Sequence, residues 1–369
     1  MRRSLRSASP FALLAVLSIA CGGSEPPPAP PPPPTPPPAP TPVIDTPTPV
    51  EDAGAPVAVA TPAATPSFVA KRQGTIRDLA VDDRWTYWLT EDGDVKRAPS
   101  SGGPALKVEG FGATATGLVV FGGKMYTSAA DPKSKGFSLL RADPNLANKP
   151  DVLATQAGTT ELLAADRLHV VWGTATGKKL SLVMLTKDAT KPVKLETWDA
   201  TAPALLALSP ANAYYADGLE IHGAPLATKS GVKKTLVTTL TAAEAHALGV
   251  TSDRIFVAIA KTAGDLEHED IVALPIAGGD PVVVAKDQAN VSAFVADDHA
   301  IYWTARGTKA AGFADGKIVK LVSGSNDATT LADKQRAPNK LALGDEDVTW
   351  TNDNAEDSTS DTDVLRLPK

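Results

Sequence analysis

The apolar residues of this chain recur in a fixed two-part pattern. A leucine or phenylalanine stands nine residues before the centre of a second, mostly apolar cluster, and another apolar residue follows it two positions later. Apolar segments of this length, separated by tight turns, are typical of paired β-strands. The pattern therefore predicts one hairpin in each of seven units. The seven pairs are Leu79 with Trp88, Leu118 with Thr127, Leu163 with Trp172, Leu206 with Tyr215, Leu248 with Val257, Phe294 with Trp303 and Leu341 with Trp350.

The units repeat at nearly constant intervals. Successive centres lie 39, 45, 43, 42, 46 and 47 residues apart, and a repeat of about 40 to 45 residues is typical of a four-stranded propeller blade. In the sixth unit we expect strands over 292–296, 300–304, 317–322 and 329–332. No amphipathic helical pattern accompanies them, so the predicted fold is all-β, a β-propeller of four-stranded blades.

The two ends of the repeat region complete each other. The seventh unit offers only three strands, the last over 363–367. Segment 67–73 resembles the fourth-strand segments 282–288 and 329–335, and all three place a glutamine six residues before the first residue of the next apolar pair. Pairing of this N-terminal strand with the last blade would cover the open edges. We therefore predict a closed, seven-bladed propeller over residues 67–369.

Three of the second clusters carry a recognisable motif. They read Tyr87-Trp88-Leu89-Thr90, Tyr302-Trp303-Thr304 and Trp350-Thr351-Asn352. These segments resemble the repeats of YWTD-type propellers, and similar repeats occur in envelope lipoproteins of myxobacteria. The resemblance covers the repeat region and implies a propeller. Members of that family usually have six blades, whereas the spacing here predicts seven.

The first 20 residues are organised like an export signal. Three arginines precede an apolar stretch over 11–20 that is too short to cross a bilayer comfortably. The stretch ends directly before Cys21, the only cysteine of the chain, so the exported chain forms no internal disulfide. An ordinary signal peptide beside a stray cysteine is the alternative to a lipoprotein signal.

The segment around Cys21 resembles the bacterial lipoprotein signal, in which cleavage leaves a diacylated cysteine at the new N-terminus. The resemblance implies that residues 1–20 are removed and that Cys21 carries the lipid anchor. In that family an aspartate after the cysteine retains the protein in the inner membrane. Gly22 stands there, so the resemblance implies the outer membrane of a Gram-negative cell.

Residues 21–66 have the composition of a linker. Of the 41 residues from Pro26 to Pro66, 18 are proline, which fixes φ and lacks an N–H, so the segment joins neither helix nor sheet. At about 3.1 Å per residue a polyproline II chain of this length reaches on the order of 100 Å. We expect a disordered, proline-rich stalk or tether between the lipid and the propeller.

The net charge bears on the partner. Removal of the three signal arginines changes the formal charge from −6 to −9 (−6 minus 3). Nucleic-acid phosphates require a basic surface, so we expect no nucleic-acid partner. We expect contact with a membrane through the lipid anchor, and with another envelope or extracellular protein or a glycan.

Long loops between second and third strands are expected in three consecutive blades. They cover 261–270, 306–316 and 352–363, whereas the first and fourth blades have tight turns there. Loops on a rigid scaffold commonly carry function, and solvated insertions are the alternative. The last loop is acidic, and carboxylates are calcium ligands, but it lacks the spacing of known calcium loops. We expect no cofactor, with calcium as the alternative at Asp353, Asp357, Asp361 and Asp363.

A second candidate set stands eleven residues before each centre, where each first strand begins. If these side chains face the channel mouth, its polar ring consists of Arg77, Glu161, His246 and Asn339. Only Glu161 and His246 are strong metal ligands, and an arginine lies among them, so the set favours water-holding channel residues over catalysis. The chain contains no Gly-X-Ser-X-Gly, P-loop or zinc motif.

Two tryptophans, Trp85 and Trp198, fall outside the column of predicted core residues. A tryptophan on the surface can stack on a sugar or anchor a protein, and the alternative is that each covers a strand edge. Taken together, the sequence predicts a non-catalytic binding or scaffold module displayed from the outer membrane. The alternatives are an extracytoplasmic lyase or hydrolase that acts through Glu161 and His246, and a structural role in envelope assembly.

Overall fold

The computed structural model describes residues 65–369 with several gaps. The gaps are 110, 112–114, 132–135, 144, 146–148, 158, 167, 177, 187–188, 190, 200–204, 227–234, 241–244, 263 and 354–360. Cys21, the predicted export signal over 1–20 and nearly all of the predicted linker therefore lie outside the described residues.

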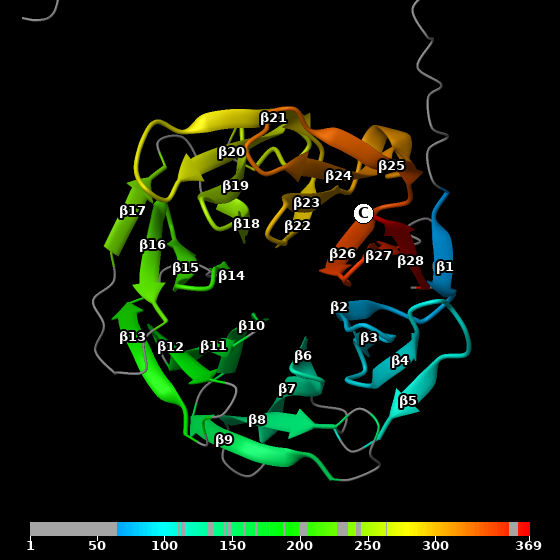
Figure 1. The fold of residues 1–369 in the computed structure, drawn as a ribbon, viewed down its shortest axis with the longest axis vertical. Coiled ribbons are helices and arrows are strands. Elements are labelled where there is room, and N and C mark those ends of the chain that lie inside the picture. Colours follow the sequence, from blue (N-terminus) through cyan, green and yellow to red (C-terminus); the bar gives the residue numbers. More distant parts are fainter. Residues whose placement is uncertain are drawn as a thin grey trace, which may run out of the picture. The chain divides into compact units, whose positions relative to one another are not determined.

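The described strands form seven four-stranded antiparallel sheets around a central channel (Figure 1). The fold is an all-β, seven-bladed propeller, as predicted. Blade one consists of β2 (Ile76–Val81), β3 (Trp85–Thr90), β4 (Val95–Pro99) and β5 (Leu106–Val108), and blade two of β6 (Ala115–Phe121), β7 (Lys124–Asp131), β8 (Gly136–Ala142) and β9 (Asp151–Ala157). Blade three consists of β10 (Thr159–Ala165), β11 (His169–Thr176), β12 (Lys179–Thr186) and β13 (Val193–Asp199). Blade four consists of β14 (Leu206–Leu208), β15 (Asn212–Asp217), β16 (Glu220–Pro225) and β17 (Thr235–Thr239).

The last three blades follow the same plan. Blades five and six are β18 (Ala245–Val250), β19 (Arg254–Ala260), β20 (Glu269–Pro275) and β21 (Val282–Gln288); and β22 (Val291–Ala296), β23 (Ala300–Ala305), β24 (Gly316–Val322) and β25 (Thr329–Gln335). Blade seven is β26 (Pro338–Leu343), β27 (Asp347–Asp353), β28 (Thr362–Pro368) and β1 (Ser67–Ala70). One short 3₁₀ helix, η1 (Lys309–Ala311), interrupts the loop between β23 and β24.

The nine-residue pattern of the sequence is a cross-strand register. In every blade the two residues of the predicted pair are direct neighbours across the hairpin of the first two strands, from Leu79 opposite Trp88 in blade one to Leu341 opposite Trp350 in blade seven. Facing side chains in a hairpin interact most strongly. The repeated pair therefore fixes the register of seven hairpins in the same way.

The N-terminal strand closes the ring. Strand β1 pairs antiparallel with β28, with Phe68 opposite Leu365, and Figure 1 shows the two lying side by side. The backbone N–H of Gln73 also donates to the carbonyl of Thr362 at 2.9 Å. The predicted closure by the segment after the linker is confirmed.

The core lies between neighbouring blades. Each hydrophobic cluster combines side chains of two adjacent sheets; Phe256 of blade five and Trp303 of blade six, for example, belong to the same cluster. Trp88, Trp172, Trp303 and Trp350 are fully buried. Sheets covered on both faces favour continuous apolar runs, which explains why the middle strands lack strict alternation.

Several predicted strand boundaries differ from the observed ones by one residue, and one boundary in blade six differs by three. The fourth strand expected over 329–332 continues to Gln335, because a β-bulge lets the ladder resume with Gln335 opposite Gly316. Lys334 takes a left-handed φ of 52° at this bulge. The polar sequence after 332 concealed this extension.

Candidate functional site

The polar column predicted for the channel mouth coincides with β-bulges of the inner strands. In six blades the register shifts where a column residue stands, as between Ala245 and Ala247 around His246. The column residues at the shifts are Arg77, Thr116, Glu161, His246, Ser292 and Asn339. The seventh, Ala204, lies outside the described residues. A bulge leaves one residue unpaired and changes the direction of its side chain. The column residues therefore share one backbone position, the unpaired residue of the bulge.

His246 is held by a buried carboxylate. Its Nδ1 lies 3.0 Å from Oε1 of Glu269, a residue with 0 % exposure at the start of β20, and the backbone N–H of Val291 donates to Oε2 at 2.6 Å. Burial raises the pKa of the Glu269 carboxyl, while the hydrogen bonds from Val291 and His246 oppose this shift. The His246 side chain is 31 % exposed. The pair thus links a buried acid to an accessible imidazole.

The carboxylate that contacts His246 is therefore Glu269, and the structure does not place Glu161 beside His246. Glu161 belongs to blade three and His246 to blade five, with β14 of blade four between their inner strands. The Glu161 side chain is not among those described. The sequence pattern places Glu269 within the predicted loop 261–270, whereas the structure places it in β20, two residues before the buried Ile271.

Arg77 and Asn339, the other two predicted ring residues, have different surroundings. Arg77 is exposed. Asn339 donates from Nδ2 to Oδ2 of Asp353 at 2.9 Å, and Arg306 donates to the same oxygen at 3.1 Å. Asp353 therefore joins blades six and seven at this end of the ring.

Two of the acidic residues considered as calcium ligands make hydrogen bonds within the propeller. Asp353 makes the contacts above, and Asp363 accepts the backbone N–H of Arg72 at 2.9 Å. Asp361 is half-buried, and Asp357 lies outside the described residues. In the described part of the chain no three His, Cys, Asp or Glu side chains gather as a metal site would require.

The long loops of blades five and six contact each other directly. The backbone N–H of Lys309 in the loop 306–315 donates to Oε1 of Glu267 in the loop 261–268 at 2.9 Å. Asn290, at the start of blade six, also donates to the carbonyl of Gly307 at 2.8 Å. Hydrogen bonds thus join the two loops, and we call their described residues the rim sector (261–262, 264–268 and 306–315).

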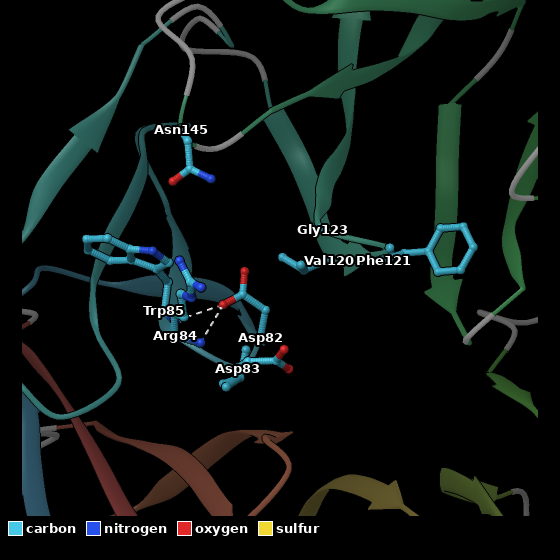
Figure 2. Close-up of a pocket in the computed structure, with 10 residues that line it drawn as sticks. Asp82, Asp83, Arg84, Trp85, Val120, Phe121, Gly123 and Asn145 are labelled. Atoms are coloured by element: carbon cyan, nitrogen blue, oxygen red, sulfur yellow. Dashed lines mark hydrogen bonds between the residues drawn. The ribbon is translucent and has the colours of Figure 1, made fainter.

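The opposite end of the propeller carries a pocket between blades one and two (Figure 2). Its volume is about 460 Å³, and we call it the Trp85 pocket. Polar residues of the β2–β3 turn form one side, and the backbone of Gly122 and Gly123 lies on the other; the polar lining residues are Asp82, Asp83, Arg84 and Asn145. Phe121 turns its ring away from Asp82 and into the core.

Asp82 organises this turn. Its Oδ1 accepts the backbone N–H groups of Arg84 at 2.9 Å and Trp85 at 2.8 Å, and its Oδ2 accepts the Tyr87 hydroxyl at 2.8 Å. Burial, followed by this contact with Asp82, raises the pKa of Tyr87. An aspartate at the first turn position commonly binds the backbone two residues later, so the sequence Asp82-Asp83 predisposes the chain to this geometry.

Trp85 and Trp198 have different environments from those expected of ligand-stacking residues. Trp85 is half-buried, and its ring packs on the core of blades one and two while the Arg97 guanidinium lies 4.2 Å above it. Trp198 is only 7 % exposed and stacks on Tyr215 with ring centroids 4.2 Å apart. Trp198 is therefore a core residue between blades three and four, and Trp85 remains at the edge of a pocket.

The inner strands enclose the channel. A cavity of about 420 Å³ is lined by the inner strands of all seven blades, with Asp78 as its acidic residue. Burial raises the pKa of Asp78, whose carboxylate accepts the backbone N–H groups of Leu79 and Leu118. The other lining residues are apolar. Because Asp78 of blade one accepts the backbone N–H of Leu118 in blade two, it joins these two blades.

No protein-family model matches the chain, and no curated protein sequence matches it. Solved structures do. The WD40 β-propeller domain of Doa1 is 11 % identical over 83 % of this chain and 98 % of its own, with a TM-score of 0.56. YCF48 bound to D1 peptide is 12 % identical over 83 % and 95 %, also with a TM-score of 0.56.

A third similar structure is the β-propeller domain of the Trilobed protease from Pyrococcus furiosus. It is 11 % identical over 75 % of this chain and 91 % of its own, with a TM-score of 0.56, and it is described as having an open velcro topology. In this chain, by contrast, β1 completes blade seven. Identities this low establish the propeller fold alone. Among the described residues, no helix has the length and hydrophobicity needed to cross a membrane.

Proposed function

We propose that this chain is an outer-membrane lipoprotein that displays its propeller as a non-catalytic binding or scaffold module for a protein or a glycan. The propeller fold supports a binding or scaffold role in general. The observation that carries the proposal is the rim sector, where Lys309 and Glu267 join two long loops on a closed ring. Loops held by a rigid scaffold are well suited to recognition.

The anchored part of the proposal rests on the sequence before the propeller. A lipid-tethered display protein requires an export signal, a cysteine for the lipid and a linker, and the chain offers matching segments over 1–20, at Cys21 and over 21–66. The lipid would supply the membrane contact. The stretch would hold the propeller away from it.

A protein partner has a parallel among the similar structures. YCF48 is a propeller whose structure contains a bound D1 peptide. By analogy, we place the protein contact of this chain on the rim sector. The exposed residues of η1, with the charged side chain of Lys309, lie there next to Glu267.

The second candidate function is an extracytoplasmic lyase or hydrolase at the channel mouth. The observation that favours it is the pair of Glu269 and His246, in which a buried carboxylate orients an accessible imidazole. Such a pair is an arrangement that acid–base catalysis uses. A stoichiometric metal that leaves on chelation together with an activity would support this function over the first.

The proposal is tested by photo-crosslinking in intact cells. A photoreactive residue at Lys309 in the full chain is expected to trap one discrete partner. The same residue at Leu236, an exposed position on the outer strand of blade four, is the control and is expected to trap none. Equal trapping at both positions, or none at Lys309, would contradict a protein-binding rim sector.

A further inference from the structure

Hydrogen bonds to neighbouring residues hold polar groups of the Trp85 pocket in place. Asp82 is held by three donors. Arg97 lies over Trp85 and donates from NH1 to Oδ1 of Asn145 at 3.1 Å. The backbone N–H of Asn145 in turn binds Oδ1 of Asp143 at 2.9 Å. A site whose side chains are already held loses less conformational entropy when a ligand binds.

Several other polar groups that line the Trp85 pocket have no hydrogen-bond partner among the described residues. Among the described residues, none makes a hydrogen bond or ion pair with the side chains of Asp83 and Arg84, both of which are exposed. Arg97 donates to Oδ1 of Asn145, while Nδ2 of Asn145 has no acceptor among the described residues and can donate to a ligand. Figure 2 shows the Asn145 amide, the Arg84 side chain and the Asp82 carboxylate around the same space. The pocket thus offers donors and acceptors together.

The charges and the shape narrow the class of ligand. Asp143 is already paired with Lys124 at 2.7 Å. Asp82 and Asp83 therefore face Arg84 and Arg97 in equal number, and this balance of charge favours a neutral ligand over an anion. The guanidinium of Arg84 on the pocket wall would repel a cation, and the described residues contain no cluster of metal ligands. An apolar ligand would bury these polar groups without partners, which is costly. A molecule with many hydroxyl groups suits the pocket, because each hydroxyl both donates and accepts.

We propose that the Trp85 pocket binds a neutral glycan, whose hydroxyl groups bridge Asp83, Arg84 and Nδ2 of Asn145. The volume of about 460 Å³ is in the range of small-ligand sites. The side chain of Val120 offers an apolar contact for ring C–H groups, and a Cβ added at Gly123 would meet nothing within 4 Å, so this wall is open. This inference rests on the proposed binding function and assigns it a ligand class.

The mode of binding differs from sugar stacking on an exposed tryptophan. Arg97 covers one face of the Trp85 indole and the core covers the other. Trp85 therefore contributes to binding indirectly, because its ring positions Arg97, which in turn holds the Asn145 amide. Hydrogen bonds from the β2–β3 turn carry the recognition, and the substitutions that test it belong in that turn.

Calorimetric titration of the full chain with a panel of neutral oligosaccharides tests this inference. The panel contains oligomers of glucose, of galactose and of N-acetylglucosamine. We expect at least one oligosaccharide to bind, and Arg84→Ala and Asp83→Asn each to weaken its binding by about tenfold or more, since each removes a charged hydrogen bond. Both residues are exposed in a turn, so the thermal unfolding of the variants is expected to match that of the original chain.

Asp298→Asn is the matched control. Asp298 follows Asp297 in the equivalent turn of blade six, and it lines the channel mouth instead of the Trp85 pocket. The control is expected to bind the oligosaccharide unchanged. Two results would overturn the inference: no binding by any member of the panel, or binding that the two pocket variants leave unaltered. Crosslinking at Lys309 is independent of both, so failure of the glycan site and failure of the binding module are distinguishable.

Discussion

Oε1 of Gln288 accepts a hydrogen bond from the indole Nε1 of Trp303, fifteen residues later, at 3.1 Å. Blade seven repeats the contact between Gln335 and Trp350 at 3.3 Å. In both cases the glutamine ends an outer strand and also donates to the carbonyl two residues before it. The glutamine therefore ties the chain between two blades to the buried tryptophan of the second blade.

Removal of this contact is expected to destabilise the propeller. Gln288→Ala would leave Nε1 of the fully buried Trp303 without an acceptor, at a cost of about 1–3 kcal/mol in the free energy of unfolding. Gln73→Ala is the control, because Gln73 precedes Trp88 by the same fifteen residues while Nε1 of Trp88 has no partner in the described structure. Denaturant unfolding measures both. Equal losses in the two variants would contradict the role of the contact.

The closing strand provides a second test of stability. Val69 of β1 is 2 % exposed, whereas its neighbour Phe68 is 46 % exposed. Val69→Asp would bury a carboxylate between blades seven and one, and we expect a loss of about 3 kcal/mol or more in the free energy of unfolding. Phe68→Asp, the control on the outward face, is expected to cost about 1 kcal/mol or less, including its contact with Lys71. A loss at Val69 no greater than that at Phe68 would mean that β1 does not close the ring.

Much of the fold could be predicted because the contacts that specify it are local. Leu79 and Trp88 meet across a hairpin, so a fixed nine-residue spacing records their contact directly in the sequence. The likeness of segment 67–73 to other outer strands similarly revealed its place in blade seven. Spacing within one blade therefore carries the architecture.

The candidate sites depend on contacts that spacing does not record. His246 meets Glu269 only because a bulge turns its side chain and because β20 begins at the carboxylate. Arg97 meets Asn145 across two blades, 48 residues apart. Trp198 became a core residue because Tyr215 of the next blade stacks on it, a neighbour that its own strand pattern does not reveal.

The buried acid of blade five predicts a pH dependence. The pKa of Glu269 is raised above 4.5 in the folded state by burial, so the folded chain favours the protonated carboxyl more than the unfolded chain does. Its contribution to stability is therefore full below pH 4.5 and is lost as the pH rises through the raised value. Glu269→Gln has no such titration and keeps partners for Val291 and His246. We expect the variant to gain stability relative to the original chain as the pH rises above 4.5.

Denaturant unfolding of the two proteins at a series of pH values measures this difference. A free-energy difference that stays constant across the series would contradict a raised pKa for Glu269. A difference that changes in the opposite direction would indicate that the contact with His246 outweighs the cost of burial.

The proposed lipid anchor is tested at Cys21. Cys21→Ser removes the thiol that would receive the diacylglyceryl group, which is the only membrane attachment that the proposal includes. We expect the variant to move from the membrane fraction to the soluble fraction after cell lysis and to lose incorporation of labelled palmitate. Gly22→Asp is the matched variant, which is expected to keep the label while the protein moves from the outer to the inner membrane. Cys21→Ser protein that stays with the membranes would show that the chain is held there by something other than a lipid at this position.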